Sequence, residues 1–411
     1  MFVPRLVAGV SLACLPLTAC SPLTSSAELQ TVPAHTVSMA TVMAEPSGPG
    51  RVAPAQRVIV TAKDGQLASV MVTGPKGEAV PGGFSADGAT WTATQATLDY
   101  ASTYSVAATA VDSRGVPVST QVTFTTSKPE KVFSAWISPQ QGSVVGMGMP
   151  ITVGFDREIS VEDRAAIEHA LVVRTATPMV GAWSWTGPRE VRFRPVNYWP
   201  GKSQVQVQAN LTGVQISGGV MGSGNVAANF AIGPAMITKV DALTHQAQVF
   251  RDGELIRTIP VTTGKPGFDT RSGTVVITTK EPQRTMDAAT GGTDTTDPEY
   301  YRIDVRWAMR ITSSGEFLHA APWSVYAQGK RNVSHGCIGM GTDNAQWLFD
   351  RSSVGDVVQI SGTPLTQDLG NGITVWMNSW DAWLADSASG AVTTLPLDSS
   401  VPPIAIPTPA V

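Results

Sequence analysis

Cysteine, runs of basic residues and long amphipathic segments are all scarce in this sequence of 411 residues. Lys and Arg number 28 against 32 Asp and Glu, and no Lys/Arg-rich run occurs, which argues against a nucleic-acid partner. The shortage of long amphipathic segments, together with abundant Thr, Val, Ser and Gly, predicts a mostly β protein. A chain of this length exceeds what one core usually organises, so we expect two to four domains.

The first twenty residues, MFVPRLVAGVSLACLPLTAC, contain one basic residue, Arg5, an apolar run and a site of small residues. The segment is too short to span a bilayer and is typical of an export signal. Its end, LTAC, resembles the bacterial lipobox, in which Cys20 would become the lipid-carrying N-terminus. A plain signal peptide is the alternative. The lipobox predicts a lipid anchor on the outer face of the bacterial plasma membrane.

The cysteine count turns attention to Cys337. The chain has three cysteines, Cys14, Cys20 and Cys337. Signal cleavage removes Cys14 and lipidation consumes Cys20, so Cys337 is left without an intramolecular partner in an exported protein, where thiols usually pair. Such a thiol is either buried and inert or retained for its reactivity.

Composition shifts divide the chain into six parts. Turn signals such as Asp64-Gly65 and Arg114-Gly115 separate short strands, which predicts β-sandwiches. The parts are a signal peptide (1–19), a flexible tether (20–52), two β-sandwiches (53–128 and 129–233), a β-rich domain with a short helix (234–362) and a Trp-containing extension with a disordered tail (363–411).

The β-rich part at 234–362 contains several local signals. Asp252-Gly253 predicts a hairpin turn, residues 301–311 alternate like a half-buried strand, and residues 342–352 predict a helix capped by Thr342 or Asp343. The polar segment 280–300 is typical of a lid or binding loop. We expect the tryptophans at 376, 380 and 383 to pack back onto the catalytic domain.

The stretch around Cys337 combines a nucleophile with two candidate bases, His335 and His319. Gly336 permits close backbone approach to a substrate, and neighbouring N–H groups could face an oxyanion. A zinc site would need more ligands than this region offers, so we expect neither a metal nor another cofactor. A buried, inert cysteine is the remaining alternative.

The motif Ser334-His335-Gly336-Cys337, with the upstream segment HAAPWS beginning at His319, resembles the signature of the L,D-transpeptidase catalytic domain. The chain most resembles the mycobacterial-type cell-wall enzymes, which carry immunoglobulin-like domains before the catalytic domain. The resemblance implies peptidoglycan tetrapeptide stems as donor and acceptor, and carbapenem β-lactams as covalent inhibitors.

The resemblance also implies residue roles. Cys337 would be the nucleophile and His319 the general base, its ring oriented by the backbone carbonyl of Ala320. The other positions implied to line the site or contact substrate are His335, Gly336, Ser334, Tyr301, Met286 and Ser314. Gly339 departs from the family, which usually has Asn or Arg at this position, and this affects the expected fit of substrate and β-lactams.

The implied reaction is a two-step acyl transfer that forms 3→3 cross-links through a cysteine thioester. Two alternatives belong to other classes. One is an L,D-carboxypeptidase, in which water replaces the acceptor amine. The other is a non-catalytic wall-binding lipoprotein, which Cys337→Ala would distinguish. A thiol-exchange protein would need a second nearby cysteine, and none is present in the sequence.

Overall fold

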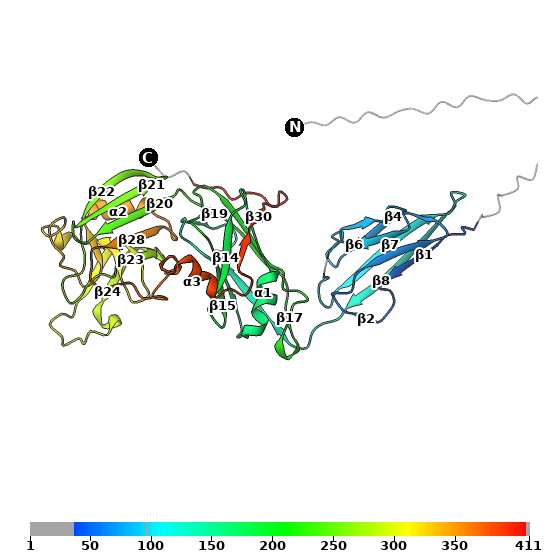
Figure 1. Cartoon of the computed structure of the whole chain (residues 1–411), viewed down its shortest axis with the longest axis horizontal. Coiled ribbons are helices and arrows are strands. Elements are labelled where there is room, and N and C mark those ends of the chain that lie inside the picture. Colours follow the sequence, from blue (N-terminus) through cyan, green and yellow to red (C-terminus); the bar gives the residue numbers. More distant parts are fainter. Residues whose placement is uncertain (1–36, 96, 408–411) are drawn as a thin grey trace, which may run out of the picture.

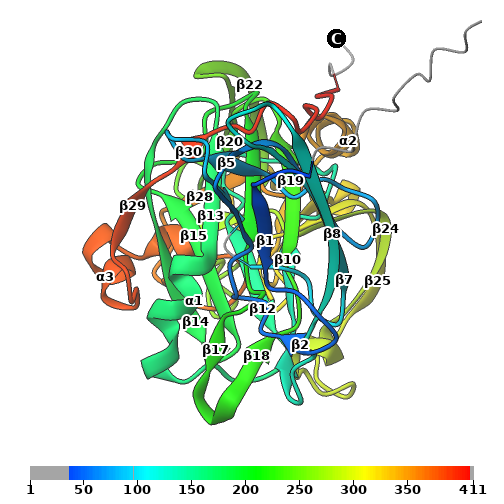
Figure 2. The same cartoon turned by 90° about the vertical axis from the view of Figure 1, so that its right-hand side faces the viewer.

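The computed structural model describes residues 37–95 and 97–407, which form three domains in a row followed by a C-terminal segment (Figure 1). The mostly β architecture predicted from composition is confirmed. Viewed along the row, the first sandwich lies in front of the other two domains (Figure 2). No helix in the described part of the chain has the length and apolarity needed to cross a bilayer.

The first sandwich packs two four-stranded sheets of order β1-β3-β6-β5 and β2-β8-β7-β4. Its core includes Val60, Trp91 and Tyr104, and the ring of Tyr104 stacks on that of Phe124 with centroids 5.4 Å apart. The strands are β1 (Thr41–Glu45), β2 (Arg51–Val52), β3 (Ile59–Lys63), β4 (Gln66–Thr73), β5 (Gly82–Phe84), β6 (Thr90–Ala93), β7 (Thr103–Val111) and β8 (Pro117–Thr126).

The prediction that the tether extends to residue 52 is wrong at its end. Strand β1 pairs antiparallel with β3, and β2 pairs with β8, so residues 41–52 belong to the sandwich. Nearby Pro and Gly residues mask these strands in the sequence, and pairing with later strands provides their backbone hydrogen bonds. The signal peptide, Cys20 and the start of the tether lie outside the described residues.

The second sandwich has two five-stranded sheets, β10-β12-β15-β14-β29 and β11-β19-β16-β13-β30, and a small sheet β17-β18-β9. Its elements are β9 (Val132–Phe133), β10 (Ala135–Ser138), β11 (Val144–Val145), β12 (Ile151–Phe155), η1 (Val161–Asp163), α1 (Arg164–Ala170), β13 (Leu171–Thr175), β14 (Val180–Gly187), β15 (Glu190–Pro195), β16 (Gln204–Ala209), β17 (Gln215–Ile216), η2 (Ser217–Gly219), β18 (Val220–Gly222) and β19 (Val226–Ile232).

The third domain contains a nine-stranded sheet of order β23-β28-β20-β21-β22-β27-β26-β25-β24. Helix α2 buries Ala345 and Leu348 in the core shared with this sheet. The elements are β20 (Met236–Asp241), β21 (Gln246–Arg251), β22 (Glu254–Thr262), β23 (Gly273–Val276), β24 (Thr279–Asp287), η3 (Ala288–Gly291), β25 (Arg302–Arg310), β26 (Phe317–Ala320), η4 (Pro322–Ser324), β27 (Ile338–Met340), α2 (Thr342–Arg351) and β28 (Val357–Ser361).

Several local predictions for the third domain are confirmed and two are corrected. The hairpin turns at Asp252-Gly253, and strand β25 and helix α2 form as expected. The segment 280–300 is not one loop, because its first part is strand β24, which pairs with β25. Helix α2 has Gly341 at its N-cap and no side-chain cap, so neither Thr342 nor Asp343 caps it.

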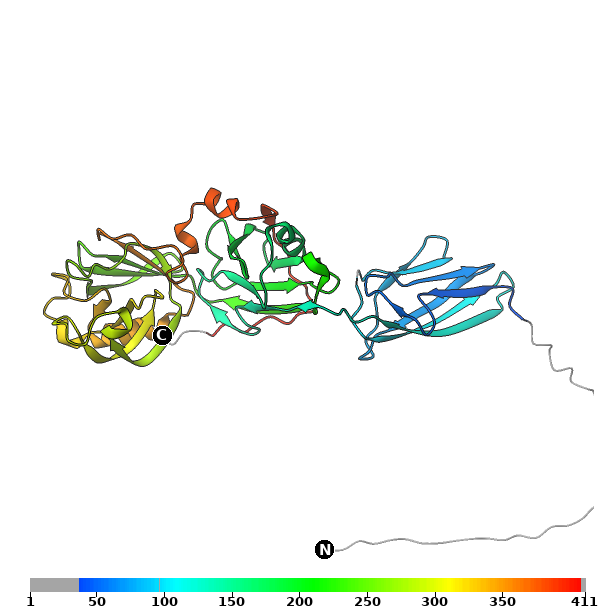
Figure 3. The ribbon, with the colours of Figure 1, turned by 90° about the horizontal axis from the view of Figure 1, so that it is seen from below.

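The C-terminal segment (363–407) leaves the third domain and crosses the second sandwich (Figure 3). It contains η5 (Val375–Met377), α3 (Trp380–Ala385), β29 (Ala391–Thr393) and β30 (Leu395–Pro396). Strand β29 pairs with β14 and β30 pairs with β13, so this segment extends both sheets of the sandwich. It therefore covers edges that would otherwise present unpaired backbone groups.

The expected packing of the tryptophans on the catalytic domain is wrong. Trp383 is 1% exposed and donates a hydrogen bond to the Ala182 carbonyl of the second sandwich. The guanidinium of Arg194, also in that sandwich, lies over the rings of three tryptophans, at positions 376, 380 and 383. Gln204 and Ile404 exchange two hydrogen bonds, so the predicted disordered tail is ordered as far as residue 404.

Candidate active site

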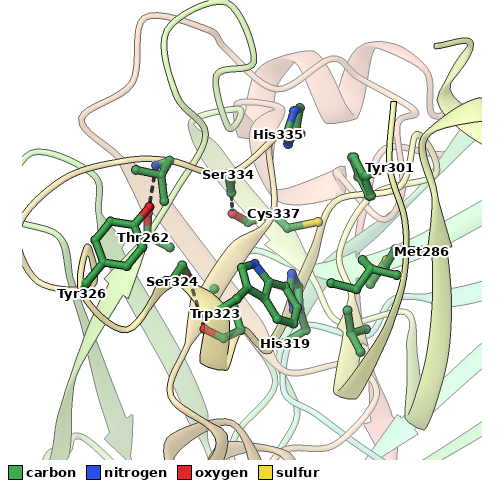
Figure 4. A pocket seen from close by; sticks show the side chains of 15 residues that line it. Thr262, Met286, Tyr301, His319, Trp323, Ser324, Tyr326, Ser334, His335 and Cys337 are labelled. Atoms are coloured by element: carbon green, nitrogen blue, oxygen red, sulfur yellow. Dashed lines mark hydrogen bonds between the residues drawn. The ribbon is translucent and has the colours of Figure 1, made fainter. Parts of the chain in front are cut away.

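The sheet brings Cys337 and His319 into the wall of one pocket. Strands β26 and β27 are parallel neighbours, with His319 opposite Gly339 in the register, and Cys337 lies immediately before β27. Both side chains line a pocket of about 290 Å³ (Figure 4). Two residues eighteen positions apart in the sequence therefore meet in one cavity.

A loop over residues 263–272, called here the cradle loop, wraps around the Cys337 motif. Lys265 N donates to the Ser334 carbonyl at 2.9 Å, and Thr270 Oγ1 donates to the Gly336 carbonyl at 2.7 Å. Gly336 has φ +116°, a conformation that side chains rarely tolerate. Ser334 Oγ donates to the Cys337 carbonyl at 2.6 Å, which completes the turn that presents the sulfur.

The thiol of Cys337 is buried, with 8% of the residue exposed. Burial raises its pKa to about 12, and a backbone hydrogen bond from Phe317 opposes the rise only in part. Sγ lies 3.8 Å from the Gly315 carbonyl oxygen. The resting residue is therefore a protonated thiol, and its activation requires a base.

His319 has the geometry of that base. Its Nδ1 lies 2.8 Å from the Ala320 carbonyl oxygen, and because a carbonyl only accepts, Nδ1 carries the proton. Nε2 is then left with a lone pair. Burial lowers the pKa of the ring, so it is uncharged near neutral pH. The indole of Trp323 stacks against the imidazole, with centroids 6.0 Å apart.

His335, the second candidate base, is held by a carboxylate. Its Nε2 lies 2.7 Å from Oε2 of Glu299, and Nζ of Lys265 lies 2.6 Å from the same oxygen. These two partners hold the pKa of Glu299 below its usual range, with Lys265 the larger influence. The imidazole also packs against the rings of Phe268 and Tyr301, with ring centroids 4.7 and 5.0 Å apart, respectively. This arrangement fixes His335 in the pocket wall.

The other residues singled out from the sequence divide into two groups. Met286, Tyr301, Ser334 and Gly339 line the pocket with Cys337, His319 and His335. Burial raises the pKa of Tyr301 to about 12, so its hydroxyl keeps its proton and can donate. Gly336 and Ala320 contribute their backbone carbonyls, as described above.

The structure does not place Ser314 among the pocket-lining residues. Ser314 is exposed, its N–H donates to Asn371 Oδ1 at 2.8 Å, and its Oγ accepts from Asn371 Nδ2 at 3.0 Å. The substrate-contact position implied by the resemblance is therefore occupied by a residue that binds the C-terminal segment. The sequence gives no sign of this, because the two residues are 57 positions apart.

Sequence reasoning missed part of the pocket wall. Thr262, Trp323, Ser324 and Tyr326 line the cavity, and Glu299 holds His335. The aromatic cluster in HAAPWSVYA could have suggested a pocket rim, since Trp323 and Tyr326 are 49% and 60% exposed. Thr262 comes from the distant strand β22, whose contact with β27 only the sheet order reveals.

The described residues contain no cluster of three or more His, Cys, Asp or Glu side chains arranged to hold a metal ion. The pocket itself offers a thiol, an uncharged imidazole whose Nε2 has a lone pair, a carboxylate-bound histidine and a phenol. These groups suit nucleophilic acyl transfer.

Two parts of the chain match known protein families. Residues 50–215 match the model of a bacterial Ig domain, and residues 237–360 match that of the L,D-transpeptidase catalytic domain. L,D-transpeptidase 2 of Mycobacterium tuberculosis is 38% identical over 80% of this chain and 80% of its own length. L,D-transpeptidase 5 of the same organism is 34% identical over 82% of this chain and 74% of its own length.

Among solved structures, one of the LD transpeptidase LdtMt1 in complex with imipenem is 34% identical. It covers 57% of this chain and 100% of its own, with a TM-score of 0.49. The identity and coverage shared with L,D-transpeptidase 2, together with the matched catalytic domain, establish that the chain belongs to the L,D-transpeptidase family.

Proposed function

We propose that this chain is a peptidoglycan L,D-transpeptidase that forms 3→3 cross-links through a thioester on Cys337. The observation that carries the proposal is that Cys337, immediately before β27, and His319, on the neighbouring parallel strand β26, line one pocket, with Nε2 of His319 left to accept a proton. The match to the L,D-transpeptidase catalytic domain supplies the reaction class.

In the first step, Cys337 Sγ attacks the carbonyl carbon that joins the diamino acid of a donor tetrapeptide stem to its terminal D-alanine. Nε2 of His319 accepts the thiol proton during the attack, because the buried thiol does not ionise at neutral pH. The carbon–nitrogen bond breaks, the imidazolium returns the proton to the leaving amine, and D-alanine departs. The stem remains bound to sulfur as a thioester.

In the second step, the side-chain amine of an acceptor stem's diamino acid attacks the thioester carbonyl. The carbon–sulfur bond breaks, an amide forms, and the proton lost by the amine returns to the sulfur. Attack by water instead would give an L,D-carboxypeptidase, which shares every feature of the donor site. A non-catalytic wall-binding role would leave the His319–Cys337 pairing without a purpose.

The anchor and spacer belong to the same proposal. Lipidation at Cys20 would hold the chain on the outer face of the plasma membrane, and the two sandwiches would carry the pocket into the wall. The linear arrangement of the described domains supports this role, since the third domain lies at the far end of the row from the first (Figure 1). Peptidoglycan stems would reach the pocket from the wall side.

Intact-mass measurement with imipenem tests the chemistry. One adduct per chain is expected on the protein starting after Cys20, with none on Cys337→Ala and a slower rate on His319→Ala. His335→Ala separates the two candidate bases, because it should retain the pH dependence that His319→Ala loses. The exposed His169 of the second sandwich gives a matched control, His169→Ala, which should react like the parent.

Turnover of a disaccharide-tetrapeptide then separates cross-linking from hydrolysis. A cross-linked dimer with release of D-alanine supports the transpeptidase, whereas tripeptide alone supports the carboxypeptidase. Absence of both the adduct and turnover on the folded parent would refute the proposal and favour the wall-binding alternative.

A further inference from the structure

Glu316 is a buried carboxylate with no part in the chemistry described so far. The residue is 5% exposed and precedes strand β26. Oε1 accepts hydrogen bonds from Arg271 N at 3.3 Å and Arg271 Nη1 at 3.0 Å. Oε2 is buried and has no hydrogen-bond partner among the described residues. Burying a carboxylate costs free energy, and one oxygen of Glu316 bears this cost without a hydrogen bond to offset it.

The carboxylate lies close to the Cys337 motif. A Cβ placed on Gly336 would lie 3.7 Å from both Cγ and Oε1 of Glu316. Its partner Arg271 belongs to the cradle loop, which holds Ser334 and Gly336 through the hydrogen bonds described above. The Glu316–Arg271 pair therefore ties the cradle loop to the start of β26.

The residues on either side of Glu316 contact Cys337. The Gly315 carbonyl oxygen lies 3.8 Å from Cys337 Sγ, and Phe317 packs with Cys337 in one buried cluster. The backbone of Glu316 itself is fixed, because its N–H donates to Thr312 Oγ1 at 2.8 Å and its carbonyl accepts from Ile311 N. Movement of Glu316 would displace both groups that contact the nucleophile.

We propose that Glu316 is a positioning residue for the acyl transfer: paired with Arg271, it locks the cradle loop to β26 and holds the Gly315–Phe317 backbone against Cys337 Sγ. This inference rests on the proposed function for its reaction, but the position of the sulfur can be measured independently of that reaction. The pair acts through the backbone and through Gly336, and it does not touch the reacting atoms.

The charges around Glu316 define how the variants should behave. Arg271 faces it from the cradle loop, and Asp368 of the C-terminal segment lies 3.4 Å from Arg271 Nε. Burial raises the pKa of Glu316, while Arg271 lowers it, and the carboxylate in turn disfavours a thiolate at Cys337. Removing the charge should therefore shift the alkylation of the thiol to lower pH, even as the acyl transfer slows.

The test compares Glu316→Gln and Glu316→Ala with the parent in two assays. Imipenem acylation by intact mass gives a rate constant and a binding constant, and iodoacetamide alkylation against pH reports the thiol directly. Glu281→Gln is the matched control, because Glu281 pairs with Arg284 at 2.7 Å on β24 in the same domain. Thermal unfolding confirms that each variant is folded.

We expect the acylation rate constant to fall about tenfold in Glu316→Gln and further in Glu316→Ala, since a displaced nucleophile can lose up to ~100-fold. The imipenem binding constant should change by less than about twofold, because the pair does not line the pocket. The alkylation midpoint should move to lower pH in both variants. Arg271→Lys should retain more of the acylation rate than Arg271→Ala.

Parent-like acylation and alkylation in a folded Glu316→Ala would overturn the proposal. So would a change confined to the imipenem binding constant, or equal losses in Arg271→Lys and Arg271→Ala. If the parent is not acylated at all, the proposed function fails, but the alkylation profiles still decide whether Glu316 controls the sulfur.

Discussion

Substitution of Gly339 by alanine tests how closely the pocket wall is packed. The sequence departs here from the Asn or Arg that the family resemblance leads one to expect. A Cβ at this position would lie 2.9 Å from Ala321 Cβ and 3.2 Å from Thr262 Cγ2. Ala321 has no flexible side chain to move, so either its backbone or strand β27 must shift.

The expected destabilisation of Gly339→Ala is about 1–3 kcal/mol, the usual range for overpacking a buried site. For a domain of this size, 1 kcal/mol lowers the melting temperature by roughly 4 °C, so a fall of about 4–12 °C is expected in calorimetry. The imipenem acylation rate should also fall, because β27 directly follows Cys337 and pairs with the strand of His319.

A double-mutant cycle identifies the contact. Ala321→Gly removes the methyl group that the new Cβ would meet, so the cost of Gly339→Ala should shrink by about 1 kcal/mol or more in that background. Gly341→Ala is the control, because its Cβ would meet nothing closer than Gln328 Oε1 at 3.7 Å. An equal cost of Gly339→Ala in both backgrounds, or no cost at all, would refute the reasoning.

Four further predictions follow from single contacts. Gly336→Ala has space for its methyl group, but it forces a residue with a side chain into φ +116°, which costs about 1–3 kcal/mol of stability. Imipenem acylation should slow at least tenfold, and a rate like that of the parent would contradict this prediction. Gly146→Ala would place its Cβ against the backbone N of Asp356, across the boundary between the second sandwich and the third domain. The clash should loosen this boundary, so we expect faster proteolysis between the two domains. A digest like that of the parent would contradict this prediction. Burial raises the pKa of Asp356 to about 8. Between pH 4 and pH 8 the unfolded chain therefore loses a proton that the folded chain keeps, so the free energy of unfolding falls as pH rises. Asp356→Asn should make this free energy, measured by urea titration, depend less on pH, and an unaltered dependence would exclude this carboxyl as its source. Trp383→Ala removes a side chain that is 1% exposed and should lower the free energy of unfolding by about 3–5 kcal/mol. Proteolysis within residues 380–396 should accelerate. Protection equal to that of the parent would show that the pairing of β29 and β30 is enough to hold this segment in place.

The main residues of the candidate site could be predicted from the sequence because they lie close together in the chain. Ser334 to Cys337 form one continuous motif, and His319 lies eighteen positions upstream in a recognisable segment. Alternation of apolar and polar residues was enough for strand β25, because a half-buried strand imposes a period of two. Family membership follows from the same local features.

The placement of Ser314 and of the tryptophans could not be predicted in this way. Ser314 binds Asn371, and Trp383 binds the Ala182 carbonyl, so each position depends on a partner far along the chain. Local patterns carry no record of such partners. The tryptophan-rich segment shows only that some apolar surface must cover it, and the second sandwich provides that surface around Arg194.

The sequence by itself determined the candidate nucleophile, the two candidate bases, the mostly β composition and the order of the domains, because side-chain chemistry and strand periodicity are local properties. Tertiary structure alone decided how each histidine is held, since Nδ1 of His319 meets the Ala320 carbonyl and Nε2 of His335 meets Glu299. It also decided that the thiol is protonated at rest, because burial, which sets its pKa, results from packing against residues of strands β24, β25 and β26.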